Sequence, residues 1–234
     1  MALVKTTATP YFQGMLIAAT KALGDLLSPA FRTVLFKSLG LTLLLFVAVF
    51  AAVQAVFQML ALVPWPWLET ILAIGAGLGL FAAFFFLMAP VTAMFAGLFL
   101  DEIALKVEAR HYPGEAVGQS LSTLMALKTG VQFGLLVLLI NVLALPLVFT
   151  GFGAIVLVVI NAYLLSREYF EMAASRFMPV DDARALRQQN GAQVFMAGLL
   201  PAVMSLVPIL NLTVPLFATA YFVHLFKRVQ RSSV

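Results

Sequence analysis

The chain has 234 residues, of which 63% are hydrophobic and only 10% are charged. A soluble domain has about 25% charged residues, so this composition excludes soluble enzyme folds and predicts an all-α integral membrane protein. The sequence contains no cysteine. Disulfide frameworks, thiolate metal sites, iron–sulfur clusters and cysteine nucleophiles are therefore excluded as well.

The first structured region predicted is an amphipathic segment over 11–37. Within 11–27, large apolar residues recur at steps of three and four positions, and polar residues take the opposite side. This pattern predicts a helix that lies along the membrane interface. Its apolar positions are Phe12, Met15, Leu16, Ala19, Leu23 and Leu26, and its polar side carries Gln13, Thr20, Lys21 and Gly24.

A second helix is predicted to begin at Pro29. Ser28 followed by Pro29 is typical of a helix N-cap with proline at the first helical position. Backbone N–H groups and the positive end of this helix would then meet close to Arg32, which predicts an oxyanion pocket. The alternative is that Arg32 only contacts lipid phosphates at the membrane surface.

Two uncharged stretches follow, at 39–63 and 71–100. Each is longer than the roughly 20 residues that a helix needs to cross a bilayer. Between them, two prolines alternate with two tryptophans, which favours a turn at the membrane interface. We therefore predict a transmembrane hairpin over 38–100 and connecting helices over 101–130.

The later uncharged stretches, 131–165 and 192–226, each contain helix breakers near the middle. Folded as hairpins, their arms would have about 16 residues and span about 24 Å. Such short hairpins either cross a thinned bilayer or enter it from one face. Asn141, Asn161 and Asn211 lie inside them and must find hydrogen-bond partners, either along a polar path or between helices.

All 14 lysines and arginines lie outside these uncharged stretches: before residue 39, in 101–130, in the polar connection 166–191 and in the tail 227–234. The positive-inside rule places these four segments, and with them both termini, in the cytoplasm. This topology accounts for the basic composition, so no nucleic-acid partner is expected.

Few residues suit catalysis or metal binding. His111 and His224 are far apart in the sequence, and we interpret them as a histidine beside a turn and a histidine at a helix end. Asp181 and Asp182 are expected to cap a helix. The sequence therefore predicts no metal site, no cofactor and no enzymatic activity.

Several short motifs occur in the order seen in one protein family. They are Phe12-Gln13-Gly14, Ser28-Pro29-Ala30-Phe31-Arg32, Val107-Glu108-Ala109-Arg110 and Val207-Pro208-Ile209-Leu210-Asn211-Leu212. With the hydropathy pattern, they make nearly the whole chain resemble the CysZ-type sulfate permeases and the wider etoposide-induced-protein domain family.

The resemblance implies one membrane domain over 1–234, with two long transmembrane helices and two half-inserted helical hairpins. It also implies a homo-oligomer of the bacterial inner membrane that passes sulfate or a related oxyanion for cysteine biosynthesis. In the family two neighbouring arginines contact sulfate, and here Arg32 is followed by Thr33. Expected substrate-binding residues are Ser28, Arg32 and Thr33, with Asn141 and Asn211 lining the path and Glu108, Arg110 and Pro208 as structural motif residues.

Two other classes of function stay open. The first is a membrane scaffold that shapes the bilayer without transporting a solute, which the threonine at position 33 favours. The second is a membrane-embedded enzyme, which would need a cluster of acids and histidines at one depth.

Overall fold

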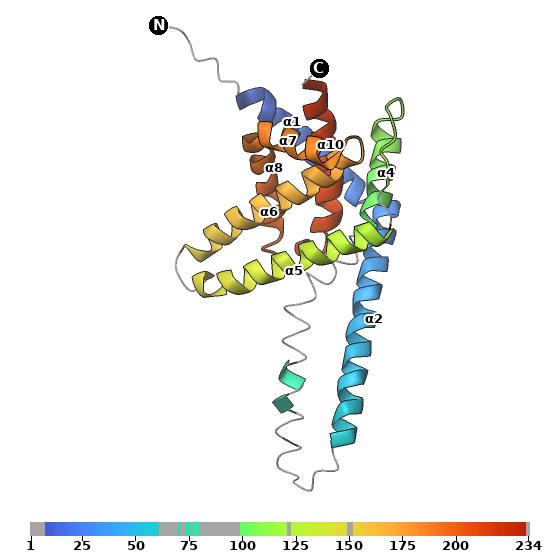
Figure 1. Ribbon diagram of the computed structural model, residues 1–234, viewed down its shortest axis with the longest axis vertical. Helices are drawn as coiled ribbons and strands as arrows, with labels where there is room; N and C mark the ends of the chain where they lie inside the picture. The colour runs from blue at the N-terminus through green and yellow to red at the C-terminus, as the bar shows by residue number, and fades with distance from the viewer. Residues whose placement is uncertain are drawn as a thin grey trace.

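The computed structural model describes residues 8–60, 70, 74–75, 77–79, 99–120, 123–148 and 152–232. Every regular element in these ranges is a helix, so the all-α prediction is confirmed for this part of the chain. Figure 1 shows the long helix α2 extending away from a group of packed helices. The start of α1 and the end of α10 lie at the opposite end of the molecule from the far end of α2.

The helices α1 (Ala8–Leu26) and α2 (Pro29–Leu60) are joined by a tight connection. The Ser28 N–H donates to the Asp25 carbonyl at 2.8 Å, and the Arg32 N–H donates to the Ser28 carbonyl at 3.1 Å. The helix start predicted at Pro29 is therefore confirmed.

Within α2, Phe31–Ala55 is long and apolar enough to cross a membrane, and it is the one such helix among the described residues. The second expected span, 71–100, lies almost wholly outside the described residues, as does the turn between the two spans.

Helix α1 packs against the other helices through its small residues and not through the large apolar residues of its periodic pattern. Gly14, Ala18 and Ala22 are buried, whereas the large side chains of Phe12 and Leu16 are more than half exposed. A Cβ atom on Gly14 would overlap the guanidinium of Arg228, so this side chain of α10 lies directly against the backbone of α1. The small residues therefore face the protein, and the large apolar residues are left facing outward.

The central helix is α10 (Val214–Ser232), which is buried from Val214 to Lys227. It packs against α1, α4 (Leu100–His111) and α6 (Gly153–Ser175). Its aromatic side chains fill the core, and Phe222 stacks on Tyr169 of α6 with ring centroids 6.4 Å apart. The core of the molecule is therefore built around the last helix of the chain.

Helices α5 (Thr123–Val148) and α6 form a hairpin that runs across the direction of α2 (Figure 1). Both are longer than the arms predicted from the uncharged stretch. The reason is that α5 begins before that stretch and α6 continues beyond it through Arg167 and Glu171. A change from apolar to charged residues does not by itself end a helix, because the backbone hydrogen bonds continue.

The last apolar stretch folds as α8 (Gly191–Met204), the single turn α9 (Pro208–Asn211) and α10. Helix α8 packs tightly on α6, since a Cβ atom on Gly198 would collide with the Ala162 carbonyl oxygen and the Ser166 side chain. Before it, α7 (Val180–Gln189) is preceded by Pro179 as its N-cap, with no side-chain capping bond. The prediction that Asp181 and Asp182 cap this helix is wrong, although both place negative charge in its first turn.

Candidate functional site

The predicted oxyanion pocket lies at the start of α2. The Arg32 side chain is exposed, and Ser28 is half-buried just before the helix. In a helix that begins at Pro29, the N–H groups of Ala30 and Phe31 have no acceptor within the helix. One turn of backbone thus combines unused N–H donors, the positive helix end and a guanidinium, which together can attract a small oxyanion.

Thr33 does not reproduce the charge of a second arginine. Its hydroxyl donates to the Pro29 carbonyl of its own helix at 3.0 Å. This local bond uses the side chain's only donor, so Arg32 supplies the positive charge of this turn.

The other expected path residues are placed only in part. The Asn141 side chain lies outside the described residues. Asn211 is half-buried at the end of α9, and its backbone N–H donates to the Val207 carbonyl at 2.8 Å. Pro208 is the first residue of α9, which fits the preference of proline for this position.

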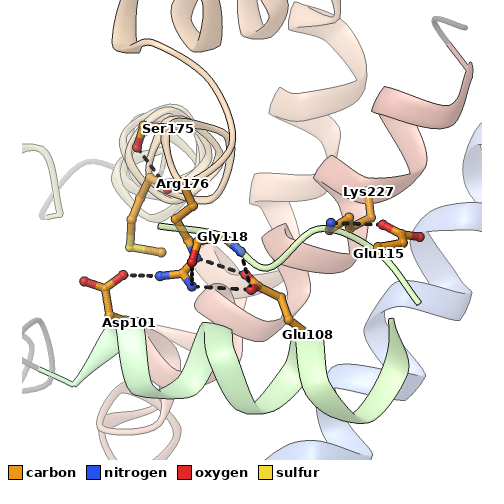
Figure 2. Close-up of polar contacts among 8 residues, drawn as sticks. Asp101, Glu108, Glu115, Gly118, Ser175, Arg176 and Lys227 are labelled. Atoms are coloured by element: carbon orange, nitrogen blue, oxygen red, sulfur yellow. Dashed lines mark hydrogen bonds and ion pairs between the residues drawn. The ribbon is translucent and has the colours of Figure 1, made fainter. Parts of the chain in front are cut away.

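Glu108 belongs to a buried network that joins α4, the loop after it and the end of α6 (Figure 2). Its carboxylate accepts from Arg176 Nε at 3.0 Å and from the Gly118 N–H at 3.0 Å. Arg176 also donates to Asp101, and its side chain is 1% exposed. The buried guanidinium therefore has carboxylates on two sides and holds the loop against the helices.

A second group of charged side chains surrounds Asp25, near the end of α1. Arg110 Nη1 donates to Asp25 Oδ1 at 3.1 Å, and His111 Nε2 lies 3.0 Å from each carboxylate oxygen. From α10, His224 Nε2 lies 3.5 Å from Asp25 Oδ2. The side chains of Asp25 and His224 are each 2% exposed. We call Asp25, His111 and His224 the Asp–His–His cluster.

The environment of the cluster keeps the Asp25 carboxylate ionised. Burial alone raises the pKa of Asp25, but the two histidines outweigh burial and lower it below its ordinary value. The Tyr112 hydroxyl lies 2.8 Å from His224 Nδ1. Burial raises the pKa of Tyr112 to about 12, so this neighbour stays a neutral phenol.

A further acid lies next to this group. Glu115 contacts Arg231, and its Oε2 lies 2.9 Å from Lys227 Nζ. Hydrogen bonds from Arg231 and then Lys227 lower the pKa of Glu115. Figure 2 shows Lys227 of α10 next to Glu115, which belongs to the same loop as Gly118. The end of α10 is thereby tied to the loop after α4.

Sequence analysis missed the Asp–His–His cluster and the role of Arg176. His224 lies in the middle of α10, so the prediction that it marks a helix end is wrong, and its ring centroid is 4.8 Å from that of His111. One signal was available in α1. Small residues at Ala18 and Ala22 continue to Asp25 with helical spacing, which marks a closely packed face that ends in an acid.

A pocket of about 170 Å³ lies between α5 and α6. Its polar lining consists of Gln132, Arg167 and Glu168, and its apolar lining of Phe133, Leu136 and Leu164. Burial, and then repulsion from Glu171, raise the pKa of Glu168 to about 7 against the opposing charge of Arg167. The pocket therefore contains an acid that changes charge near neutral pH.

Comparison with known proteins gives a match to one family model, described as sulfate transporter CysZ/etoposide-induced protein 2.4, over residues 18–215. A comparison with curated proteins finds no match. The matched range contains the start of α2, Glu108, Asp25 and His111, and it ends before His224.

Proposed function

The chain belongs to the sulfate transporter CysZ/etoposide-induced protein 2.4 family, and from this premise we propose that it is a permease for sulfate or a related small oxyanion. The family is one of membrane transporters, and α2 contains a helix able to cross a bilayer. We place the protein in the bacterial inner membrane with both termini in the cytoplasm, where the imported anion feeds cysteine biosynthesis. The match to a transporter family favours transport over enzymatic activity.

The observation that carries this proposal is the structure of the first turn of α2. Arg32 is exposed at the point where the apolar helix begins, next to backbone N–H groups that lack acceptors within the helix. An anion attracted there would be held by charge-assisted bonds, each contributing roughly 1.5–3 kcal/mol. With threonine at position 33, we expect weaker anion binding than a pair of arginines would give.

The rest of the path is proposed from the two later hairpins. Asn141 in α5 and Asn211 in α9 are polar residues in otherwise apolar segments. An amide in such a segment needs hydrogen-bond partners, which either water along a path or a neighbouring helix provides. We propose that these two residues line the passage and that further copies of the chain complete its walls.

The proposal is tested by measuring radiolabelled sulfate uptake into liposomes that contain the wild-type protein, Arg32→Ala or Lys128→Ala. Lys128 is an exposed lysine outside the first turn of α2 and serves as the control. We expect uptake by the wild type and the control, and at least about a tenfold loss in Arg32→Ala, because 1.4 kcal/mol corresponds to a factor of ten. Equal loss of sulfate uptake in Arg32→Ala and Lys128→Ala would show that Arg32 has no specific role in anion binding.

The competing function is a membrane scaffold that does not transport. The exposed Phe12, Leu16 and Leu23 on α1 favour it, since they offer an apolar face to the bilayer surface. Wild-type uptake equal to that of empty vesicles, with correct insertion shown by protease protection, would reject the permease. A change in vesicle shape under the electron microscope would then support the scaffold.

A further inference from the structure

The Asp–His–His cluster brings together side chains from three helices that are distant in the sequence. Asp25 comes from α1, His111 from the last residue of α4, and His224 from α10. One possible ligand atom from each residue lies within 4.8 Å of the others. Imidazole nitrogens and a carboxylate oxygen are the ligands used by zinc and related transition ions when thiolates are absent.

The strongest single observation is the state of His224 Nε2. This buried atom has no hydrogen-bond partner among the described residues. It lies 3.5 Å from Asp25 Oδ2, beyond the 2.7–3.2 Å of ordinary nitrogen–oxygen hydrogen bonds. Because buried polar atoms are nearly always paired, this nitrogen indicates an additional partner between the imidazole and the carboxylate.

Two of the three separations in the cluster are close to those of a tetrahedral ion, and the third, between the two imidazoles, is within 4.8 Å. With bonds of about 2.0–2.1 Å, neighbouring ligand atoms of a tetrahedral zinc site lie about 3.3–3.4 Å apart. Asp25 Oδ2 is 3.0 Å from His111 Nε2 and 3.5 Å from His224 Nε2. Shifts of a few tenths of an ångström would bring both pairs to that separation.

The surrounding residues orient the ligands in the way that metal sites require. Tyr112 lies 2.8 Å from His224 Nδ1, and when this nitrogen donates its hydrogen to the hydroxyl oxygen, the Nε2 lone pair is directed at the cluster. Arg110 binds Asp25 Oδ1, while Oδ2 lies within 3.5 Å of both imidazoles. The His111 side chain is 19% exposed and provides the route of entry.

We propose that Asp25, His111 and His224 bind one divalent transition-metal ion of the zinc class. Three protein ligands leave a fourth position for water or a small anion. The bound ion links α1, α4 and α10 at the core. The positive charges of Arg110, which contacts Asp25, and of Lys21, which acts on His224, oppose a cation and weaken its binding. The proposal goes beyond transport and does not depend on sulfate being the substrate.

The chain is well suited to a direct test, because it contains only two histidines and no cysteine. Protein purified without a histidine tag is treated with chelator and titrated with Zn²⁺ or Co²⁺. We expect one ion per chain by calorimetry and elemental analysis, a visible Co²⁺ absorption typical of tetrahedral coordination, and a higher thermal unfolding midpoint with Zn²⁺.

The variants separate metal binding from folding. His224→Gln and Asp25→Asn should bind Zn²⁺ at least about tenfold more weakly, whereas Asp181→Asn, at an exposed acid in α7, should bind as the wild type does. If His224→Gln does not fold, His111→Gln serves in its place, because His111 is the more exposed ligand. It should also bind Zn²⁺ at least about tenfold more weakly.

Folded wild-type protein that binds no Zn²⁺ or Co²⁺ would overturn the proposal, and so would unchanged binding in His111→Gln. Both readouts are independent of sulfate uptake, so failure of the permease assay leaves this result unaffected.

Discussion

Single buried charges hold this membrane protein together at two places. Arg176 is almost fully buried and contacts Asp101, Glu108 and the Gly118 carbonyl, so its donors have acceptors. Asp25 is equally buried, but one of the histidines beside it keeps an unpaired nitrogen. The guanidinium of Arg176 is surrounded by acceptors, whereas the cluster around Asp25 leaves one buried nitrogen without a hydrogen-bond partner in the described part of the chain.

The Arg176 network predicts a large effect of a single substitution. Arg176→Met leaves the Glu108 carboxylate buried without its counter-ion. We expect this to lower the free energy of unfolding by about 3–5 kcal/mol. Denaturant unfolding in detergent measures the change, with Arg184→Met as the control, because Arg184 is about half exposed. Adding Glu108→Gln to Arg176→Met should restore part of the lost stability. If Arg176→Met and Arg184→Met unfold alike, Arg176 does not stabilise the fold.

Glu168 predicts a pH dependence of stability. Its pKa is raised from 4.5 to about 7 in the folded protein, so between these values the folded state binds the proton more tightly than the unfolded state. The contribution of this residue to stability therefore falls as pH rises from about 4.5 to about 7 and stays low above that. Glu168→Gln removes this dependence.

Thermal unfolding at pH 5 and pH 8 tests this prediction. Relative to wild type, Glu168→Gln should raise the unfolding midpoint more at pH 8 than at pH 5. Asp182→Asn, at an exposed acid in α7, should show no such difference. A Glu168→Gln effect of the same size at both pH values would contradict the assignment.

At the scale of helices, local sequence signals predict some helix boundaries, but they do not predict how the helices pack against one another. The start of α2 at Pro29 and the end of α4 at His111 follow from capping and turn residues next to them in the sequence. The packed face of α1 could not be predicted, because hydrophobic periodicity does not distinguish a face toward lipid from a face toward protein.

The Asp–His–His cluster was beyond prediction for a related reason. It forms only when α1, α4 and α10 pack together, and no spacing in the sequence records that arrangement. The groups of the proposed anion site at Ser28 and Arg32 lie close together in the sequence and are brought together by one helical turn. Anion binding by these groups stays a prediction.

Two glycines with different surroundings, one in the contact between α6 and α8 and one on the exposed side of α1, predict opposite effects of substitution by alanine. Gly198→Ala places a methyl group against the Ala162 carbonyl, so α8 must move away from α6, and overpacking of this kind typically costs about 1–3 kcal/mol. Gly24→Ala, on the exposed side of α1 with open space around it, should be neutral or stabilising by up to about 1 kcal/mol. Unfolding midpoints in detergent measure both. A neutral Gly198→Ala would contradict the close packing.

At the scale of the whole molecule, the charged connections gather at one end. Figure 1 shows α4, α7, the start of α1 and the end of α10 in the same half of the molecule, while α2 extends away from them. This arrangement agrees with the positive-inside expectation, in which all four basic segments share one side of the membrane. A path for an anion that starts at Arg32 would then open on the same side.

This arrangement predicts the outcome of labelling with a membrane-impermeant thiol reagent. The chain has no native cysteine, so Lys106→Cys in α4 and Arg184→Cys in α7 can each be labelled alone in oriented membranes. Both should react from the cytoplasmic side, because both residues are partly exposed and lie on connections between apolar segments. Thr213→Cys, in the turn before α10, reports whether the last hairpin reaches the other side. Reaction of positions 106 and 184 from opposite faces would show that the basic segments do not share one surface, and an anion entry at Arg32 facing the cytoplasm would lose its basis.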